Sequence, residues 1–329
     1  MKKNILICNS NMFVPYVLTE CLEKKDCKFI VASDTVNIIQ FFDFLKLDNV
    51  ELYKYKTGSF SVIRQEKKRM KAYLLCSNID RIVFYHAEFG EMANWLLKKL
   101  SKIGISVEYH KVFDSIPGPM AKIYKGFKIR VRQRLFFGYS PDILDQGSRL
   151  IPSLPKSFFK SINAKVIIPK TNDNLIKEIL KKTIDKLEIK GRVLFVSGSV
   201  VAENYVSECE YTNKMDKLID IVGIDRAAIK LHPRYNDAFG KELSLNQIPK
   251  FIPGNVLLDV FDVYIGYLST LLVEAAHKGK TVISTLHLLE PNSETAQQRF
   301  QELLDNRLGD KGIIFYPNTI EEFKKYLSI

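Results

Sequence analysis

The chain has 329 residues, of which 46 % are hydrophobic and 26 % charged, and its formal net charge is +12. This length exceeds one compact core and suits two domains, and the residue balance excludes extensive disorder. The five cysteines are scattered without a C-x-x-C pair, so we expect no structural zinc site, no disulfide framework and a reducing compartment. No apolar run of about 18 residues predicts a transmembrane helix, and the run that ends at Cys8 is too short for a signal peptide. These features predict a cytoplasmic protein.

Short apolar runs alternate with helical patterns from the start of the chain. The runs that have the length of buried strands cover residues 5–8, 29–32, 50–53, 81–85 and 105–108. The clearest helical pattern covers residues 89–101, with Met92, Trp95, Leu96 and Leu100 on one face. This alternation predicts a parallel sheet with helices on both faces.

A second set of alternating elements follows an irregular stretch at residues 138–159, which carries three prolines. Strands are predicted at 166–169, 192–197, 227–231, 263–266, 281–284 and 312–316, and helices at 174–187, 210–221, 271–278, 294–305 and 320–327. We therefore expect an α/β protein with two Rossmann-like domains, residues 1–155 and 156–329. Ligands of such sheets bind beyond the carboxyl ends of the strands, so residues that follow strands are the site candidates.

The first candidate is the segment Lys230-Leu231-His232-Pro233-Arg234, at the end of a predicted strand. Proline removes a backbone donor and fixes φ, so Pro233 ends the strand and holds His232 at its carboxyl end. There an imidazole donates to a phosphate oxygen, and as imidazolium it stabilises a leaving phosphate. A surface histidine at a strand end is the alternative.

The second candidate is Ser269-Thr270, which follows a predicted strand and opens a helix that ends at Gly279. Unpaired N–H groups and a partial positive charge make a helix N-terminus a phosphate site, and two hydroxyls add donors. Ser269 is alternatively an N-cap and no more. Together with His232 in the same predicted sheet, the pair predicts a nucleotide-phosphate pocket.

A strand-end His-Pro, then Ser-Thr opening a helix with a Glu one turn later, resembles bacterial sialyltransferases of glycosyltransferase family 52 and related capsular sialyl- and polysialyltransferases. The resemblance covers roughly residues 192–284, including the loop at Gly198 and Glu203. It implies a GT-B fold and an inverting transfer, without a metal or other cofactor, of a sialic acid or related sugar from a CMP-sugar. Lys230, His232, Pro233, Ser269, Thr270 and Gly198 would then bind the CMP donor in the domain 156–329, and the domain 1–155 would take the acceptor.

The general base is expected to be a carboxylate. Many of these enzymes supply it from a D/E-D/E-G motif, which this chain lacks. Glu203, after the strand 192–197, and Glu108, at the end of the strand 105–108, are the candidates, and each is alternatively a solvated loop carboxylate.

A run of basic residues interleaved with aromatics covers residues 122–137. This composition suits a lipid headgroup interface, and a solvated lysine-rich face is the alternative. A surface-glycan acceptor such as lipooligosaccharide or capsule would place the protein at the inner face of the membrane. No zinc-finger, RRM or helix-turn-helix signature indicates nucleic acid, and a homodimer stays open.

Two other enzyme classes and one non-enzyme remain as alternatives. Polyol-phosphate transferases of the teichoic-acid type share the His-Pro and a later Ser-Ser, but they usually carry an acidic residue where this chain has Gly266-Tyr267-Leu268. A UDP-sugar enzyme of the GT-B fold is the second. A non-catalytic module that binds polyanions through its positive charge is the third.

Overall fold

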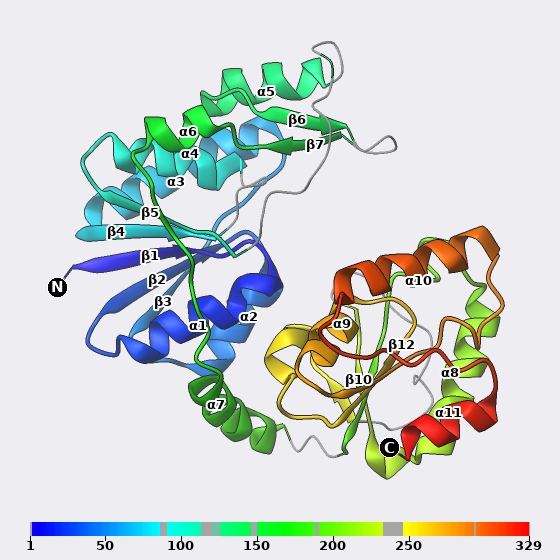
Figure 1. Cartoon of the computed structure of the whole chain (residues 1–329). Coiled ribbons are helices and arrows are strands. Elements are labelled where there is room, and N and C mark those ends of the chain that lie inside the picture. Colours follow the sequence, from blue (N-terminus) through cyan, green and yellow to red (C-terminus); the bar gives the residue numbers. More distant parts are fainter. Residues whose placement is uncertain are drawn as a thin grey trace. The chain divides into compact units, whose positions relative to one another are not determined.

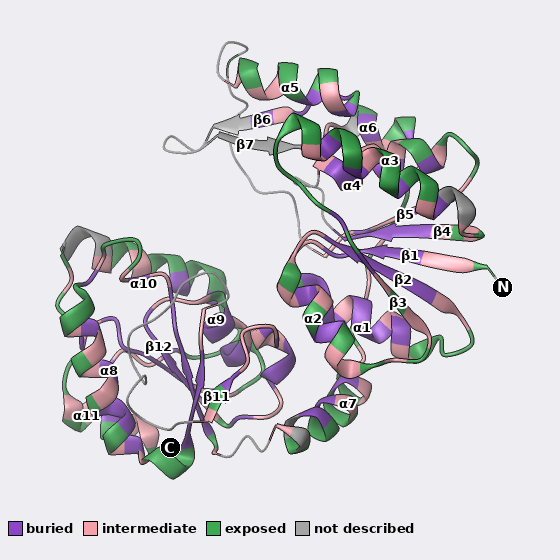
Figure 2. Cartoon of the chain, turned by 180° about the vertical axis from the view of Figure 1, so that it is seen from behind, coloured by how far each residue is buried: buried purple, intermediate pink, exposed green. Residues whose placement is uncertain are grey.

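The computed structural model describes residues 2–85, 91–112, 122, 126–145, 150–187, 191–232, 246–292 and 294–328. The chain divides into two compact units, Met1–Asn172 and Asp173–Ile329 (Figure 1). Each unit is built around its own parallel sheet. Figure 2 shows that the central strands of both sheets are buried, whereas exposed positions lie on the outer faces of the helices.

The first unit contains, within the described residues, a six-stranded sheet of order β3-β2-β1-β4-β5-β8, in which all pairs are parallel. Leu6 pairs with Val31 on one side and with Val83 on the other. Apolar, β-branched side chains suit strands that are covered on both faces. The strands are β1 (Lys3–Ile7), β2 (Lys28–Ser33), β3 (Val50–Lys54), β4 (Ile79–Phe84), β5 (Ser106–His110) and β8 (Lys165–Ile167).

Helices cover the two faces of this sheet (Figure 1). One face carries α1 (Val14–Glu23) and α2 (Val36–Leu45), and the other carries α3 (Phe60–Cys76), α4 (Glu91–Ser101), α5 (Phe127–Phe137) and α6 (Lys156–Ser161). Alternate strand residues point to the same side of the sheet, so Ile5 and Ile7 pack together in the cluster that includes Met70 of α3 and Leu96 of α4. Two strands that pair antiparallel with each other, β6 (Asp142–Asp145) and β7 (Leu150–Ser153), follow α5.

The second unit contains, among the described residues, a five-stranded parallel sheet of order β11-β10-β9-β12-β13. Its strands are β9 (Val193–Val196), β10 (Ala227–Lys230), β11 (Asn246–Ile248), β12 (Val263–Gly266) and β13 (Thr281–Ser284). Its helices are α7 (Asp173–Lys186), α8 (Glu208–Val222), α9 (Thr270–His277), α10 (Glu294–Leu308) and α11 (Ile320–Leu327). Local sequence sets several helix starts: Ser207 accepts from the Glu210 N–H, and Thr319 from the Glu322 N–H, each at 3.2 Å.

One strand of the second predicted set forms but belongs to the first sheet, and another does not form. The segment predicted as a strand at 166–169 forms β8, which pairs with β5 and so belongs to the first sheet. The segment 312–316 makes a single bridge, between Ile283 and Phe315, instead of a strand. The division after Asn172 also lies beyond the expected boundary at residues 155/156, because α6 and β8 pack and pair within the first unit.

None of the helices in the described part of the chain is long and apolar enough to cross a membrane.

Candidate functional site

The sheet of the second unit has its topological switch point between β9 and β12. From β9 the chain builds outward through β10 and β11 on one side, and it then returns to build β12 and β13 on the other. The two connections leave in opposite directions, and α/β sheets bind ligands beyond the carboxyl ends of the strands at such a point. Two loops start at these strand ends: one begins with Ser197-Gly198-Ser199 after β9, and the other is Tyr267-Leu268-Ser269 after β12.

Glycine lets these two loops approach each other closely. A Cβ on Gly198 would lie 3.1 Å from the carbonyl oxygen of Leu268 and 3.2 Å from Val200 Cγ2. One residue before the second loop, a Cβ on Gly266 would lie 2.7 Å from the carbonyl oxygen of Val196. The predicted site residue Gly198 is therefore brought beside the segment that leads to Ser269.

Helix α9 begins at the switch point with the two predicted hydroxyl residues. Ser269 has an extended backbone and is the N-cap, with its Oγ accepting from the Leu271 N–H at 3.3 Å. Thr270 is the first helical residue and its side chain is exposed. The Leu272 N–H also donates to Ser269, to its carbonyl oxygen at 3.1 Å, and the first turn of the helix carries the positive end of the helix dipole. Ser269 thus acts as an N-cap, which is the structural alternative that its sequence position predicted. Thr270 presents a hydroxyl at a site suited to an anion.

His232 lies at the end of the neighbouring strand β10 and is tied to the loop after β9. Its backbone N–H donates to Ser197 Oγ at 2.6 Å, and the Ser197 N–H donates to the carbonyl oxygen of Lys230 at 3.0 Å. These bonds fix the backbone of residues 230–232 beside the loop that follows β9. Pro233, the other member of the predicted motif, lies outside the described residues.

The side chain of Lys230 is buried and satisfied by backbone carbonyls. Its ammonium donates to the carbonyl oxygen of Leu231 at 3.0 Å and to that of Lys250 at 3.5 Å. Burial lowers the pKa of Lys230 to about 8, and the charge of Lys250 adds to this. Lys230 therefore joins the segment after β11 to the end of β10.

A carboxyl group that was not among the predicted site residues lies one turn into α9. Burial raises the pKa of Glu274 to about 7, although the charge of Lys278 opposes this. Lys278 itself is paired with Asp173 and Asp259, each at 3.0 Å. Glu274 follows Thr270 by four residues, which places both on one helix face, roughly 6 Å apart between Cβ atoms. The sequence signal was present as the Glu one turn after Ser-Thr, but its burial was not visible there.

Glu203, a predicted base, lies on the loop after β9 and is exposed. Its N–H donates to the carbonyl oxygen of Ser199 at 2.8 Å, which closes a turn. Asn292 fixes the loop by donating to the carbonyl oxygens of Asn204 and Tyr205 at 2.9 and 2.8 Å. The structure therefore places Glu203 on the switch-point loop, five residues beyond Gly198.

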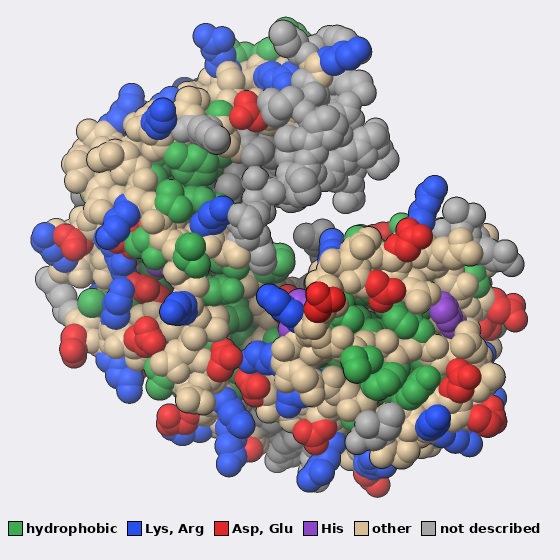
Figure 3. Space-filling model, viewed as in Figure 1, with side chains coloured by type: hydrophobic (Ala, Val, Ile, Leu, Met, Phe, Trp, Pro, Cys, Tyr) green, Lys and Arg blue, Asp and Glu red, His purple; other side chains and the backbone are tan. Residues whose placement is uncertain are grey.

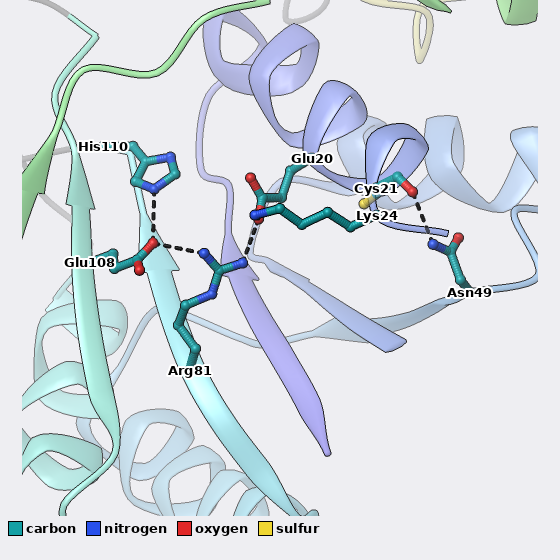
Figure 4. A network of polar contacts seen from close by, with 7 residues as sticks. All are labelled: Glu20, Cys21, Lys24, Asn49, Arg81, Glu108 and His110. Carbon is teal, nitrogen blue, oxygen red and sulfur yellow. Dashed lines mark hydrogen bonds and ion pairs between the residues drawn. The ribbon is translucent and has the colours of Figure 1, made fainter. Parts of the chain in front are cut away.

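Glu108, the other predicted base, belongs to a network between α1 and the first sheet (Figure 4). Arg81 binds Glu20 and donates to Glu108 Oε2 at 2.8 Å, and His110 Nε2 lies 3.2 Å from the same oxygen. Burial acts to raise the pKa of Glu20, but Lys24 and Arg81 outweigh it and hold that pKa below its ordinary value. Burial lowers the pKa of His110, so the neutral ring donates its Nε2–H to the carboxylate. Glu108 lies within β5, and its carboxylate is committed to this network.

The first sheet has its own switch point, between β1 and β4. Beside it, at the carboxyl ends of β1, β2 and β3, lies a polar cluster: the Tyr55 hydroxyl donates to Asn9 Oδ1, and Thr35 Oγ1 donates to the Asn9 carbonyl oxygen at 3.2 Å. Asp34, directly after β2, is half-buried, and burial raises its pKa. Asp34 is a second carboxyl that the sequence analysis did not select, although it follows a predicted strand.

Among the described residues, no group of three or more His, Cys, Asp or Glu is arranged to hold a metal ion.

Two separate parallel sheets, each covered by helices and each with a switch point, define a GT-B-like fold. The chain is similar to the UDP-GlcNAc 2-epimerase from Neisseria meningitidis bound to UDP-GlcNAc, with 13 % identity over 100 % of this chain and 98 % of that chain and a TM-score of 0.50. Another match is the UDP-GlcNAc 2-epimerase from Methanocaldococcus jannaschii, with 14 % identity over 100 % of this chain and 92 % of that chain and a TM-score of 0.48. A third is the wall teichoic acid polymerase TagF, with 13 % identity over 99 % of this chain and 87 % of that chain and a TM-score of 0.47.

No protein-family model matches the chain, and no curated protein matches its sequence. The similarity to solved structures thus shows a GT-B-like fold and no specific family.

Proposed function

We propose that this protein is an enzyme that uses a nucleotide sugar, and that the switch point of the second unit binds the nucleotide phosphate. One observation carries the proposal: three strand ends bring the N-terminus of α9, with Thr270, to the Gly198 loop, beside which His232 is held by its backbone. The positive end of a helix dipole, a hydroxyl and an imidazole form a set that suits a phosphate.

Each group has a distinct proposed role. The Thr270 hydroxyl donates to the phosphate oxygens, which the positive end of the α9 dipole stabilises, and the His232 ring donates to the oxygen that becomes the leaving group. The half-buried Glu274 carboxyl accepts hydrogen bonds from hydroxyls of the nucleotide's sugar. A carboxyl kept in a poorly solvated position beside an anion site is a mark of function, because its burial opposes stability.

A UDP-sugar is the donor that we propose first, because the meningococcal epimerase with the same fold binds UDP-GlcNAc. A CMP-sugar is the second candidate, favoured by the strand-end His232 and the Ser269-Thr270 pair that resemble sialyltransferases. A surface glycan remains the proposed acceptor for a transferase.

The carboxylate that would activate an acceptor is a further proposal. Glu203 and Glu108 are the candidates from the sequence, and the structure adds Asp34. We favour Asp34 over Glu108, because Asp34 lies at the carboxyl edge of the first sheet with a raised pKa, whereas Glu108 binds Arg81.

Thermal unfolding with UDP, UMP, CMP, GDP and ADP tests the proposal. A nucleotide at 100 times its dissociation constant adds about 2.7 kcal/mol to the unfolding free energy. A shift with UDP supports the UDP-sugar enzyme, and a shift confined to CMP supports the second candidate. If no nucleotide shifts the transition, the phosphate site is wrong.

Two variants locate the binding. His232→Ala removes the ring but keeps the backbone bond to Ser197, and Thr270→Val removes the exposed hydroxyl while keeping the shape. Each should weaken nucleotide binding about tenfold or more, whereas Thr171→Val, at an exposed threonine of the first unit, should leave it unchanged. Equal affinity in all three variants would place the nucleotide elsewhere.

A further inference from the structure

Helix α5 of the first unit carries an apolar stripe on its outward face. Phe127, Val131 and Leu135 follow one another at four-residue spacing, and their exposed fractions are 62 %, 37 % and 73 %. An exposed helix face normally carries polar residues, because apolar side chains in water oppose folding. An apolar stripe held outward therefore indicates a surface that something covers.

Contacts on the opposite side of α5 fix this orientation. Gln133 and Phe137 are buried, and the Gln133 amide lies 3.4 Å from a Glu91 carboxylate oxygen. Lys67 of α3 donates to the Phe136 carbonyl oxygen, and its ammonium lies 4.6 Å from the centre of the Phe137 ring. The helix is thus anchored to α3 and α4 by its inner face, and the stripe cannot turn inward without breaking these contacts.

Basic residues lie on both sides of the stripe. At 100° per residue, Lys128 and Arg132 fall on one flank and Arg130 and Arg134 on the other. The charge extends over the neighbouring helices, because α3, α4 and α5 together contain eleven Lys and Arg against two Glu. These helices thus hold a net +9 of the chain's +12. Figure 3 shows Lys and Arg side chains, drawn in blue, over the upper part of the first unit, where Figure 1 places these helices.

Further apolar side chains are exposed on the layer that α3, α4 and α5 form. Phe60, the first residue of α3, is 57 % exposed, and its ring lies 4.9 Å from that of Phe136. Between α3 and α4 lies a cavity of about 110 Å³ whose wall includes Leu74, Trp95 and Ile103. Lys71 and Lys99 also line this cavity, so its wall contains both apolar and cationic side chains.

We propose that the layer formed by α3, α4 and α5 docks on an anionic lipid bilayer, with the α5 stripe inserted at the headgroup boundary. The pairing of an apolar centre with basic flanks fits this occupant: acyl chains receive Leu135 and Phe127, while lipid phosphates receive the flanking cations. A nucleic acid or acidic glycan would engage the cations but offer nothing comparable to an exposed Leu135. The surface is independent of the proposed nucleotide site.

Vesicle binding of the whole chain tests the proposal. The protein should co-sediment with vesicles of phosphatidylcholine that contain roughly 30 % phosphatidylglycerol, and far less of it should co-sediment with vesicles of phosphatidylcholine alone. Lys128→Ala with Arg134→Ala should weaken binding about 25-fold, at about fivefold for each charge. Leu135→Ser with Phe127→Ser should also weaken it at least about tenfold.

Matched controls separate this surface from total charge and hydrophobicity. Ile168→Ser alters an equally exposed apolar residue (79 %) outside these helices, and Lys25→Ala with Lys170→Ala removes two exposed cations elsewhere. Both controls should bind vesicles like the wild type. All variants should keep the wild-type far-UV circular dichroism and nucleotide response, which shows that they are folded.

The fluorescence of the single tryptophan, Trp95, provides a second measurement, because this residue lines the cavity between α3 and α4. Its emission should shift to the blue with anionic vesicles and be quenched by brominated lipids. Equal binding to neutral and anionic vesicles, no binding, or loss in the charge variant but not in the Leu135→Ser/Phe127→Ser variant would overturn the proposal. The last result would identify a plain polyanion surface.

Discussion

Replacing Glu274 by glutamine tests the electrostatic cost of the candidate site. Burial raises the pKa of Glu274 from its ordinary 4.5 to about 7, so the folded protein holds a proton there that the unfolded chain has released. Between these two values the folded state binds more protons. The unfolding free energy must therefore fall as pH rises from about 4.5 to 7, and the full cost is present above pH 7.

The size of this cost follows from the pKa difference. One pKa unit corresponds to about 1.4 kcal/mol, so the change from 4.5 to about 7 is worth about 3 kcal/mol. Glutamine has the same shape as glutamic acid and carries no charge at any pH. Glu274→Gln should therefore gain up to about 3 kcal/mol over the wild type at pH 8 and almost nothing at pH 4.5.

Urea unfolding at pH 4.5, 6 and 8, followed by far-UV circular dichroism, measures the difference. Fluorescence of Trp95 serves as an internal reference, because this residue belongs to the first unit. Glu302→Gln, at an exposed glutamate of α10, is the matched control and should change stability by less than about 0.5 kcal/mol at every pH. An equal gain at pH 4.5 and pH 8, or no gain at either, would refute the burial of an ionisable Glu274. The same variant should bind nucleotide more weakly if the proposed function is correct.

Three other outcomes follow from the structure. Arg81→Met should destabilise the first unit by about 1–3 kcal/mol in urea unfolding, because it removes the cation that two half-buried carboxylates share and leaves Glu20 with Lys24 and Glu108 with His110; a loss under about 0.5 kcal/mol would contradict this. Gly266→Ala should cost about 1–3 kcal/mol and lower nucleotide affinity, because the new Cβ would lie 2.7 Å from the Val196 carbonyl oxygen; wild-type stability and affinity would show that the loops relax freely. Iodoacetamide should label the exposed Cys209 in the folded protein but not Cys8, where burial raises the pKa to about 12, and mass mapping of a labelled Cys8 would refute that burial.

Local sequence predicted the two-sheet architecture well. Buried parallel strands need uninterrupted apolar runs, and each of β9, β10, β12 and β13 has one that lies within the range predicted for it. The helix at α9 was equally readable, because Ser269 caps it and Gly279 ends it with a positive φ of 71°. The proposed phosphate site was predictable for the same reason: its residues follow strands directly, and strand ends are where this class of sheet binds ligands.

Which strands pair with each other was harder to predict from the sequence. A run such as residues 165–167 is compatible with either sheet, and only its hydrogen bonds with β5 assign it to the first. Residues 312–316 have a strand-like composition, but only Phe315 reaches the sheet, through its bridge to Ile283. Pairing joins segments that are distant along the chain, so periodicity within one segment carries no information about it.

The sequence by itself determined the alternation of elements, the helix caps and the residues at strand ends, because these depend on neighbours within a few positions. Only the tertiary structure decided which carboxyl groups have perturbed pKa values. Glu108 is bound by Arg81, whereas Glu274 and Asp34 are poorly solvated. Solvation and charge pairing depend on which distant elements pack together, and that packing turns similar carboxylates into a structural ion pair in one place and candidate site residues in another.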